Sequence, residues 1–318
     1  MSNSVGHADD LYVFNTGETN YDIKYIYDVN AEPKVSRKYV VSIYERNSAR
    51  IKQIEDVCRQ GYPRPKVGHL VYNLQKDCKT YQCPIQVLHQ HNVSFCFMHK
   101  VASTTFQSHF VKLSGFRNLS KSEIQFIGHR LPRYSLRALL IEPLVNNYKV
   151  LFVRHPFRRL VSAYYAKLVI ECHNLIDRKP GPLCWITDHI KKKYRPTLNS
   201  GPVRFQEFVW YLIDNNNTAF DSHWSRVWNV CQPCAVHYDF IGKLETSNED
   251  INFLYKKLKL DKIIKTTNLT MNRSWSDKMI GECFGQLSRT EFSKLCKIYE
   301  RDLEMFDYSV DFFQQYIR

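Results

Sequence analysis

The sequence lacks any long apolar run. No stretch of its 318 residues approaches the roughly 20 apolar residues that a transmembrane helix needs. Residues 1–30 also lack the apolar core of a secretory signal peptide. We therefore expect no membrane span in this chain. Two interpretations remain open: the protein is soluble in the cytoplasm, or the N-terminus as given is incomplete.

Acidic residues are scarce relative to basic ones. The chain has 31 Asp and Glu against 45 Lys and Arg, a net charge of +14, which favours polyanionic partners. Nucleic acid, an anionic membrane and a sulfated or uronate-bearing polysaccharide all fit this sign. With 44% hydrophobic and 24% charged residues the composition is globular rather than disordered. The length allows one large α/β domain or two small ones.

The ten cysteines form no dense framework of the kind that staples small domains. Cys78 and Cys83 are either two unrelated thiols or a small disulfide loop. The Cys231–Cys234 pair fits a redox site, half of a zinc site or a local disulfide, and because no second C-x-x-C accompanies it, we expect no zinc. Five N-glycosylation sequons suggest a secretory chain: Asn92, Asn118, Asn216, Asn268 and Asn272.

The stretch 149–167, KVLFVRHPFRRLVSAYYAK, has the pattern of a strand, a turn and a helix. Val150–Val153 is apolar enough for a buried strand, and Pro156 suits the first position of the following helix. Arg154 at the strand tip is a forked, permanently charged donor shaped for phosphate, and Ser162 adds a hydroxyl. Together with the free N–H groups of the helix start, they predict a phosphate pocket. The alternative is an ordinary strand–helix junction whose arginines are solvated.

The stretch 93–113, VSFCFMHKVASTTFQSHFVKL, repeats this plan. Val93–Met98 is predicted to be a strand, and apolar residues from Thr104 onwards follow helical spacing. The turn between them contains Lys100 and can wrap an anion with its backbone N–H groups. Because G-x-x-x-x-G-K-[ST] is absent, the turn is not a Walker A loop, and we expect no nucleoside triphosphatase.

A third short apolar run, Ile124–Arg130, is predicted to be a strand that ends near His129. Strands near residues 95, 126 and 151 then alternate with helices, including one expected at Leu136–Val145. This order predicts an α/β fold with a mainly parallel sheet, in which ligands bind at the carboxyl ends of the strands. Lys100, His129 and Arg154 are therefore expected to converge.

The remaining chain is expected to add helices around the sheet and one more strand. Residues 169–202 are loop-rich and basic, which fits either a grip on an acidic polymer or a solvated charged face. A strand is expected within YDFIG, residues 238–242. Helices are expected at 48–60, 205–214, 245–258 and 288–299.

Taken together, these stretches resemble the Golgi carbohydrate sulfotransferases that act on chondroitin, dermatan and terminal glucuronyl glycans. His99–Ser108, HKVASTTFQS, stands where that family has a 5′-phosphosulfate loop like P-K-V-A-C-T-N-W-K-R. Phe152–Tyr164 resembles the family's 3′-phosphate motif, F-V-R-[DE]-P-F-x-R-L-[IV]-S-A-[FY], with one change. FQEFVWYLID, HW, CQPC, YDFIGKLET and LCKIYERDLEMFDYS follow in the family's order, up to Ser309. Here His99 replaces a proline, His155 an acidic residue, and Gln107–Ser108 a basic pair.

The resemblance implies a P-loop-like sulfotransferase fold over residues 86–318, behind a partly ordered lead-in of residues 1–85. It also implies a carbohydrate O-sulfotransferase that moves a sulfuryl group from 3′-phosphoadenosine 5′-phosphosulfate to a sugar hydroxyl of a glycosaminoglycan such as chondroitin, in the Golgi lumen. No metal and no nucleic-acid partner are expected, and the oligomeric state stays open. The resemblance assigns donor binding to His99, Lys100, Val101, Ala102, Ser103, Thr104, Thr105, Arg154 and Ser162.

A general base is needed for the acceptor hydroxyl, and histidine suits that task near neutral pH. His129 is the first candidate because it ends a predicted strand, and its Gly-His resembles a histidine segment of related uronyl sulfotransferases. His223 is the second candidate. Lys100 is expected to stabilise the departing 5′-phosphate, and Arg154 and Ser162 to hold the 3′-phosphate. The competing functions are a cytosolic sulfotransferase for small hydroxyl compounds and a non-catalytic polyanion-binding relative.

Overall fold

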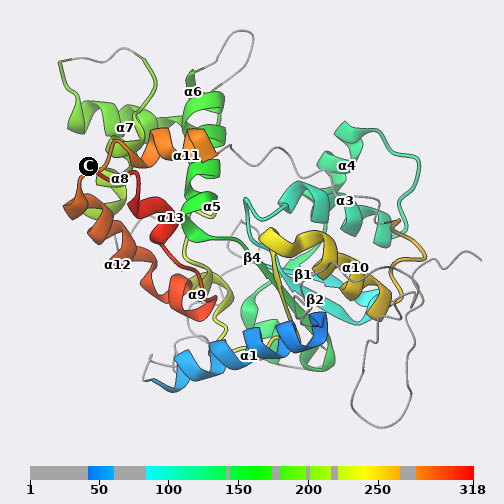
Figure 1. Cartoon of the computed structure of the whole chain (residues 1–318). Coiled ribbons are helices and arrows are strands. Elements are labelled where there is room, and N and C mark those ends of the chain that lie inside the picture. Colours follow the sequence, from blue (N-terminus) through cyan, green and yellow to red (C-terminus); the bar gives the residue numbers. More distant parts are fainter. Residues whose placement is uncertain are drawn as a thin grey trace, which may run out of the picture.

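A five-stranded sheet is the centre of the protein (Figure 1). The structure, a computed structural model, describes residues 42–60, 84–140, 144–173, 180–197, 201–215, 221–265 and 277–318. The strand order is β3-β1-β2-β4-β5. The strands are β1 (Ile85–Leu88), β2 (Val93–Cys96), β3 (Arg133–Tyr134), β4 (Tyr148–Val153) and β5 (Phe240–Lys243).

The three strands β2, β4 and β5 are parallel, and β1 and β3 extend the sheet in antiparallel fashion. Cys96 at the end of β2 pairs with Leu151, and Val153 at the end of β4 pairs with Lys243. The three parallel strands therefore end at one edge. The predicted α/β fold with a central, mainly parallel sheet is confirmed.

Helices surround the sheet and build a second layer beside it. They are α1 (Ile43–Arg59), α3 (Ser103–Leu113), α4 (Lys121–Gly128), α5 (Pro156–Ala163), α6 (Glu171–His173), α7 (Cys184–Tyr194), α8 (Phe205–Asp214), α9 (Val227–Cys231), α10 (Ser247–Lys257), α11 (Asp277–Phe284), α12 (Arg289–Met305) and α13 (Asp311–Gln314). A π-helical segment, η4 (Tyr164–Ile170), continues α5. Short 3₁₀ turns are η1 (His89–His91), η2 (Leu136–Leu140), η3 (Leu144–Asn146) and η5 (Leu244–Thr246).

Two apolar cores hold these layers. One surrounds the sheet and includes residues of α1, α3 and α10. The other lies among α5, α7, α8, α11, α12 and α13. Figure 1 shows the second group gathered around α5, which continues directly from the central strand β4. The helix that follows the predicted phosphate turn is thus fixed by a core of its own. No helix in the described parts of the chain has the length and apolarity needed to cross a membrane.

The predicted strand at Ile124–Arg130 is wrong, because this segment forms helix α4. Ser120 accepts a hydrogen bond from the Glu123 N–H, and the Glu123 carboxylate accepts one from the Ser120 N–H. This capping box starts a helix and competes with the strand pattern of a short apolar run. His129 is consequently the exposed residue at the end of α4 and not the end of a strand.

Other predicted segments differ in type or extent. The helix expected at Leu136–Val145 consists of 3₁₀ turns in the described residues. The segment 169–202, expected to be loop-rich, contains the end of η4, α6 and all of α7. The expected helices at 205–214 and 288–299 are present as α8 and α12, and the one at 48–60 begins earlier, at Ile43, behind a Ser42 cap. The interpretations of Cys78, Cys83, Asn216, Asn268 and Asn272 fall outside the described residues.

Each of the three interpretations of the Cys231–Cys234 pair is wrong. Cys234 forms a disulfide with Cys58 of α1, and Cys231 forms one with Cys96 at the end of β2. Sequence reasoning failed because each partner is distant along the chain, by 176 and 135 residues. A third disulfide, Cys172–Cys184, joins α6 to α7.

Candidate functional site

The turn between β2 and α3 has the features of an anion-binding loop. Lys100 (φ 66°) and Ala102 (φ 50°) both adopt the left-handed backbone region, which costs a non-glycine residue roughly 1 kcal/mol or more. Ala102 is the N-cap of α3 and offers no side-chain hydrogen bond to the first turn. The first N–H groups of α3 therefore have no side-chain cap, and an anion can accept hydrogen bonds from them.

Lys100 brings a destabilised cation to this turn. Burial, followed by the charges of Lys167 and Arg154, lowers the pKa of Lys100 to about 8. A cation held at such a site is stabilised when an anion arrives, because the anion offsets both the desolvation and the repulsion. Of the other residues assigned to donor binding, Val101 is buried, Ser103 and Thr105 are half-buried and Thr104 is exposed.

The second predicted corner, after β4, lies directly against the first. The buried Arg154 donates a hydrogen bond from Nη1 to the Lys100 carbonyl, at 3.3 Å. Burial lowers the pKa of Arg154 to about 10, so it remains a guanidinium at neutral pH. Ser162, also buried, lies further along α5. The structure thus brings Lys100 and Arg154 together across 54 residues of sequence.

His155 caps the start of helix α5 with its side chain. Its Nδ1 accepts a hydrogen bond from the Phe157 N–H (3.1 Å), so its Nε2 carries the proton and donates to the Ser309 carbonyl (2.8 Å). Burial lowers the pKa of His155 to about 4, which keeps the ring neutral. The Glu245 carboxylate accepts from the His155 N–H at 2.9 Å. The start of α5 therefore keeps both a cap and a nearby negative charge.

His223 packs against the turn between β2 and α3 (residues 97–102), called the donor turn below, and is oriented by a carboxylate. Its ring centroid is 4.5 Å from that of His99, and its Nδ1 donates to Asp221 Oδ1. Burial lowers the pKa of His223, although Asp221 opposes the shift, and burial together with His223 lowers the pKa of His99 to about 3. Both rings are neutral near pH 7. With Nδ1–H bound to Asp221, the Nε2 atom of His223 is the one that can accept a proton.

His129 is the exposed residue that ends α4. Partial burial and the charges of Arg133, Lys167 and Arg130 lower its pKa. Its predicted place beside Lys100 and Arg154 depended on a strand that the protein does not form. His223, by contrast, packs against His99 of the turn between β2 and α3.

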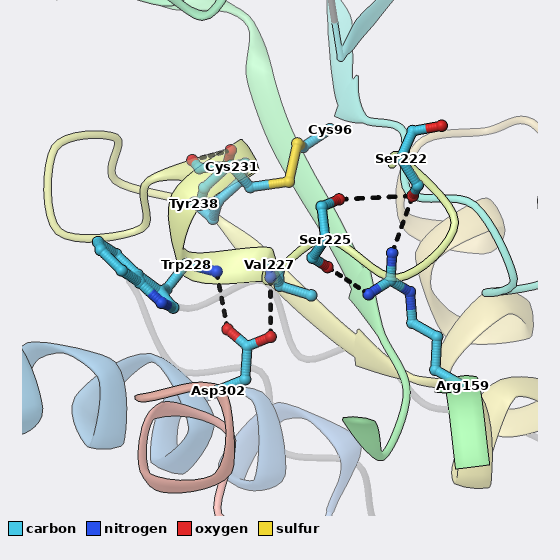
Figure 2. Close-up of a disulfide and its surroundings, with 9 residues drawn as sticks. All are labelled: Cys96, Arg159, Ser222, Ser225, Val227, Trp228, Cys231, Tyr238 and Asp302. Carbon is cyan, nitrogen blue, oxygen red and sulfur yellow. Dashed lines mark hydrogen bonds between the residues drawn. A yellow bond between two sulfur atoms is a disulfide. The ribbon is translucent and has the colours of Figure 1, made fainter. Parts of the chain in front are cut away.

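Arg159 is the residue that sequence reasoning missed. It is 2% exposed, and its Nε donates to the His99 carbonyl at 2.9 Å. The other guanidinium nitrogens donate to the carbonyls of Ser222 (3.0 Å) and Ser225 (Figure 2). Arg159 thus connects the donor turn to the segment that carries His223. The available signal was an arginine on the apolar, inward face of a helix, where an unpaired charge is costly.

The segment around His223 has two further attachments (Figure 2). Asp302 on α12 accepts hydrogen bonds from the N–H groups of Val227 and Trp228, both at 2.8 Å. The Cys96–Cys231 disulfide joins the end of α9 to the end of β2, three residues before His99. These attachments hold the His223 segment at a defined position relative to the donor turn.

Comparisons with known proteins identify the family that has this arrangement. A family model described as "Sulfotransferase family" matches residues 84–309, more than half of the chain. The chain belongs to the sulfotransferase family. The match contains both βα corners as well as Arg159 and His223.

Several relatives of this sulfotransferase are named carbohydrate sulfotransferases. It is 31% identical over 244 residues to carbohydrate sulfotransferase 11 of Rattus norvegicus, covering 69% of this chain and 65% of that protein. It is 30% identical to carbohydrate sulfotransferase 8 of Homo sapiens (71% and 56% covered) and 28% identical to carbohydrate sulfotransferase 9 of Homo sapiens (72% and 54%). The chain therefore spans less than two thirds of the length of these relatives. No solved structure matches it significantly. The predicted resemblance to carbohydrate sulfotransferases is confirmed.

Proposed function

We propose that this sulfotransferase moves a sulfuryl group from 3′-phosphoadenosine 5′-phosphosulfate to a sugar hydroxyl of an acidic polysaccharide such as chondroitin. The hydrogen bond from Arg154 to the Lys100 carbonyl carries the proposal, because it joins two anion-binding corners from distant parts of the chain. A nucleotide with phosphates at its 3′ and 5′ positions has charges that match such a pair. The names of the relatives and the net charge of +14 support an acidic polysaccharide as acceptor.

In this proposal each corner holds one end of the donor. Lys100 and the N–H groups at the start of α3 bind the 5′-phosphosulfate, with His99, Val101 and Ala102 shaping the turn and Ser103, Thr104 and Thr105 forming the first helical turn. Arg154 and Ser162 bind the 3′-phosphate. They would discriminate this donor from nucleotides that lack that phosphate, because their polar groups would then lose a partner.

The transfer itself is an in-line displacement. The acceptor oxygen attacks sulfur, the bond from sulfur to the 5′-phosphate oxygen breaks, and adenosine 3′,5′-bisphosphate leaves. Negative charge grows on that phosphate, and Lys100 with the α3 N–H groups stabilises it, by analogy with phosphoryl transfer. The proton of the acceptor passes to Nε2 of His223, whose imidazolium is stabilised by Asp221. His129 is the second candidate for this role. The scheme needs no metal.

We place the protein in an oxidising, lumenal compartment such as the Golgi. Three disulfides among the described residues support this, because structural disulfides are rare in the cytosol. Sequons at Asn92 and Asn118 lie on exposed turns, where glycan attachment is sterically possible.

A transfer assay tests the proposed function. Purified protein with isotopically labelled donor is given chondroitin, dermatan, heparan and a small phenol as acceptors, with Arg154→Ala as the inactive control. We expect label on chondroitin or dermatan, and a loss with the control. Preference for the phenol would support a small-molecule sulfotransferase. Salt-sensitive polymer binding without transfer would support a non-catalytic relative.

A further inference from the structure

The connection between α3 and α4 is fixed at both ends (Figure 1). At the end of α3, the Gly115 and Phe116 N–H groups donate to carbonyls of the last helical turn, at 3.1 and 3.3 Å. These two bonds, with Gly115 at φ 93°, form a Schellman motif. The capping box of Ser120 fixes the start of α4. The residues between these points, 116–119, are therefore held in a defined conformation.

This connection carries an N-glycosylation sequon, Asn118-Leu119-Ser120. Asn118 is exposed and adopts the left-handed backbone region, with φ 53°, which asparagine tolerates better than most residues. Phe116, two residues before it, is 44% exposed. An aromatic side chain that is nearly half open to solvent thus precedes the attachment point.

Phe116 and Asn118 line one hollow of about 430 Å³. Phe116 and Leu119 give this hollow apolar surface, and Lys112 and Arg117 add hydrogen-bond donors. A sugar has the matching mixture of groups. Its C–H face packs on an aromatic ring, whose face is negative, and its hydroxyl and acetamido oxygens accept hydrogen bonds. The hollow therefore suits a sugar that is attached at Asn118.

Asn92 provides a matched comparison within the same chain. It is also exposed, has a left-handed backbone (φ 52°) and begins a sequon that ends in serine, Asn92-Val93-Ser94. The residue two positions before it is Gln90. The two sites therefore share the backbone conformation of the asparagine and differ in the aromatic neighbour.

We propose that Asn118 carries an N-linked glycan whose first N-acetylglucosamine packs on Phe116 in this hollow. The donor is a lipid diphosphate-linked oligosaccharide, and the host's oligosaccharyltransferase catalyses the step. The amide nitrogen of Asn118 forms a bond to C1 of the first sugar and releases a proton to solvent, while the bond from C1 to the phosphate oxygen breaks and the lipid diphosphate leaves. The inference rests on the proposed lumenal compartment and not on the proposed sulfuryl transfer.

The experiment measures glycan occupancy and thermal unfolding of the full chain, secreted from cultured animal cells behind an added signal peptide. Mass spectrometry of glycopeptides gives the occupancy at each sequon. The variants Asn118→Asp and Asn92→Asp keep the shape of asparagine and tolerate the left-handed region, but they accept no glycan. Asn118→Asp is also combined with Phe116→Leu, which keeps an apolar side chain and removes the ring. A further wild-type sample has its glycans trimmed enzymatically to the first sugar.

We expect a glycan on most Asn118 side chains, and we expect Asn118→Asp to lower the Tm by about 2–4 °C. Trimming to one sugar should preserve the Tm, because the sugar that contacts Phe116 remains. In the Phe116→Leu background, the loss caused by Asn118→Asp should fall to about half or less. Asn92→Asp should change the Tm by less than about 1 °C.

An unmodified Asn118 in a protein that carries glycans at other sequons would overturn the inference and leave the lumenal compartment unaffected. A Tm loss of equal size with and without Phe116 would show that the sugar does not pack on the ring. Absence of glycan from every sequon would overturn the inference and would also remove the sequons as support for the lumenal placement. The transfer assay decides the proposed sulfuryl transfer separately.

Discussion

Replacement of Arg159 should lower kcat much more than it lowers donor affinity. Its guanidinium donates to three backbone carbonyls, one in the donor turn and two in the segment of His223. Hydrogen bonds from a charged donor contribute about 1.5–3 kcal/mol each, and a buried carbonyl left without a donor costs about 1–3 kcal/mol. Breaking the whole buried network in Arg159→Met should therefore cost about 3–5 kcal/mol of the free energy of unfolding. A domain has only about 5–15 kcal/mol in total, so the variant is expected to fold with a lowered Tm.

The catalytic effect follows from geometry. With Arg159 gone, nothing in this network fixes the distance between His99 and the carbonyls of Ser222 and Ser225, and His223 moves relative to the donor turn. A displacement of about 1 Å can cost about 100-fold in rate. Donor affinity should fall much less, because Lys100 and Arg154 are still present. The Arg159→Lys side chain can reach one carbonyl at a time, so the kcat of this variant should lie between those of the wild type and Arg159→Met.

The assay measures thermal unfolding, kcat, and calorimetric affinity for adenosine 3′,5′-bisphosphate, all well below the Tm of the variant. The matched control is Arg158→Met, because Arg158 is the preceding residue on α5 but pairs with the exposed Asp277. A surface pair of this kind contributes only about 0–1 kcal/mol. A folded Arg159→Met protein with wild-type kcat would refute the positioning role. A loss of nucleotide affinity as large as the loss of kcat would show that Arg159 serves donor binding instead.

Three further predictions use the same site. On the acid side, kcat/KM should fall only below pH 6.5, because the lowered pKa of His223 keeps its imidazole neutral down to that pH. On the alkaline side, kcat/KM should fall near pH 8, where Lys100 loses its proton. Lys100→Arg should remove only the alkaline fall, and an alkaline fall that remains in this variant would belong to another group. His223→Ala should lower kcat by about 100-fold or more with little change in nucleotide affinity, whereas His129→Ala should not, and the reverse result would restore His129 as the base. Serine at both Cys96 and Cys231 should lower the free energy of unfolding by about 2–5 kcal/mol and reduce kcat, and an unchanged Tm in this variant would show that the disulfide does not stabilise the His223 segment.

The sequence was sufficient where local pattern and tertiary role agree. β4 and α5 combine a buried apolar strand, a proline at the first helical position and helical spacing behind it. These signals act within a few residues, and the edge at which parallel strands end then places Lys100 near Arg154. The strand prediction for Ile124–Arg130 failed because a run of seven residues fits both the helical and the strand periodicity. The Ser120–Glu123 capping box was the signal that decides for a helix.

The rest of the site depends on contacts between residues that are far apart in the sequence, and no local pattern predicts such contacts. Cys231 and Cys234 lie close together in sequence, yet each forms a disulfide with a strand or helix far away. The role of Arg159 is defined by carbonyls that reach it from residues 99, 222 and 225, two of which lie more than 60 positions away. The preference for His223 over His129 likewise rests on the contact with His99, which exists only in the folded chain.

The most direct test of the central claim is a comparison of two nucleotides by calorimetry. The wild type should bind adenosine 3′,5′-bisphosphate more tightly than adenosine 5′-phosphate by about 10- to 100-fold, the value of a charge-assisted contact with the 3′-phosphate. Arg154→Ala should lose about tenfold or more of this ratio, whereas Lys100→Ala should weaken both nucleotides and keep the ratio. An unchanged ratio in Arg154→Ala would contradict the claim that the two βα corners hold opposite ends of one nucleotide.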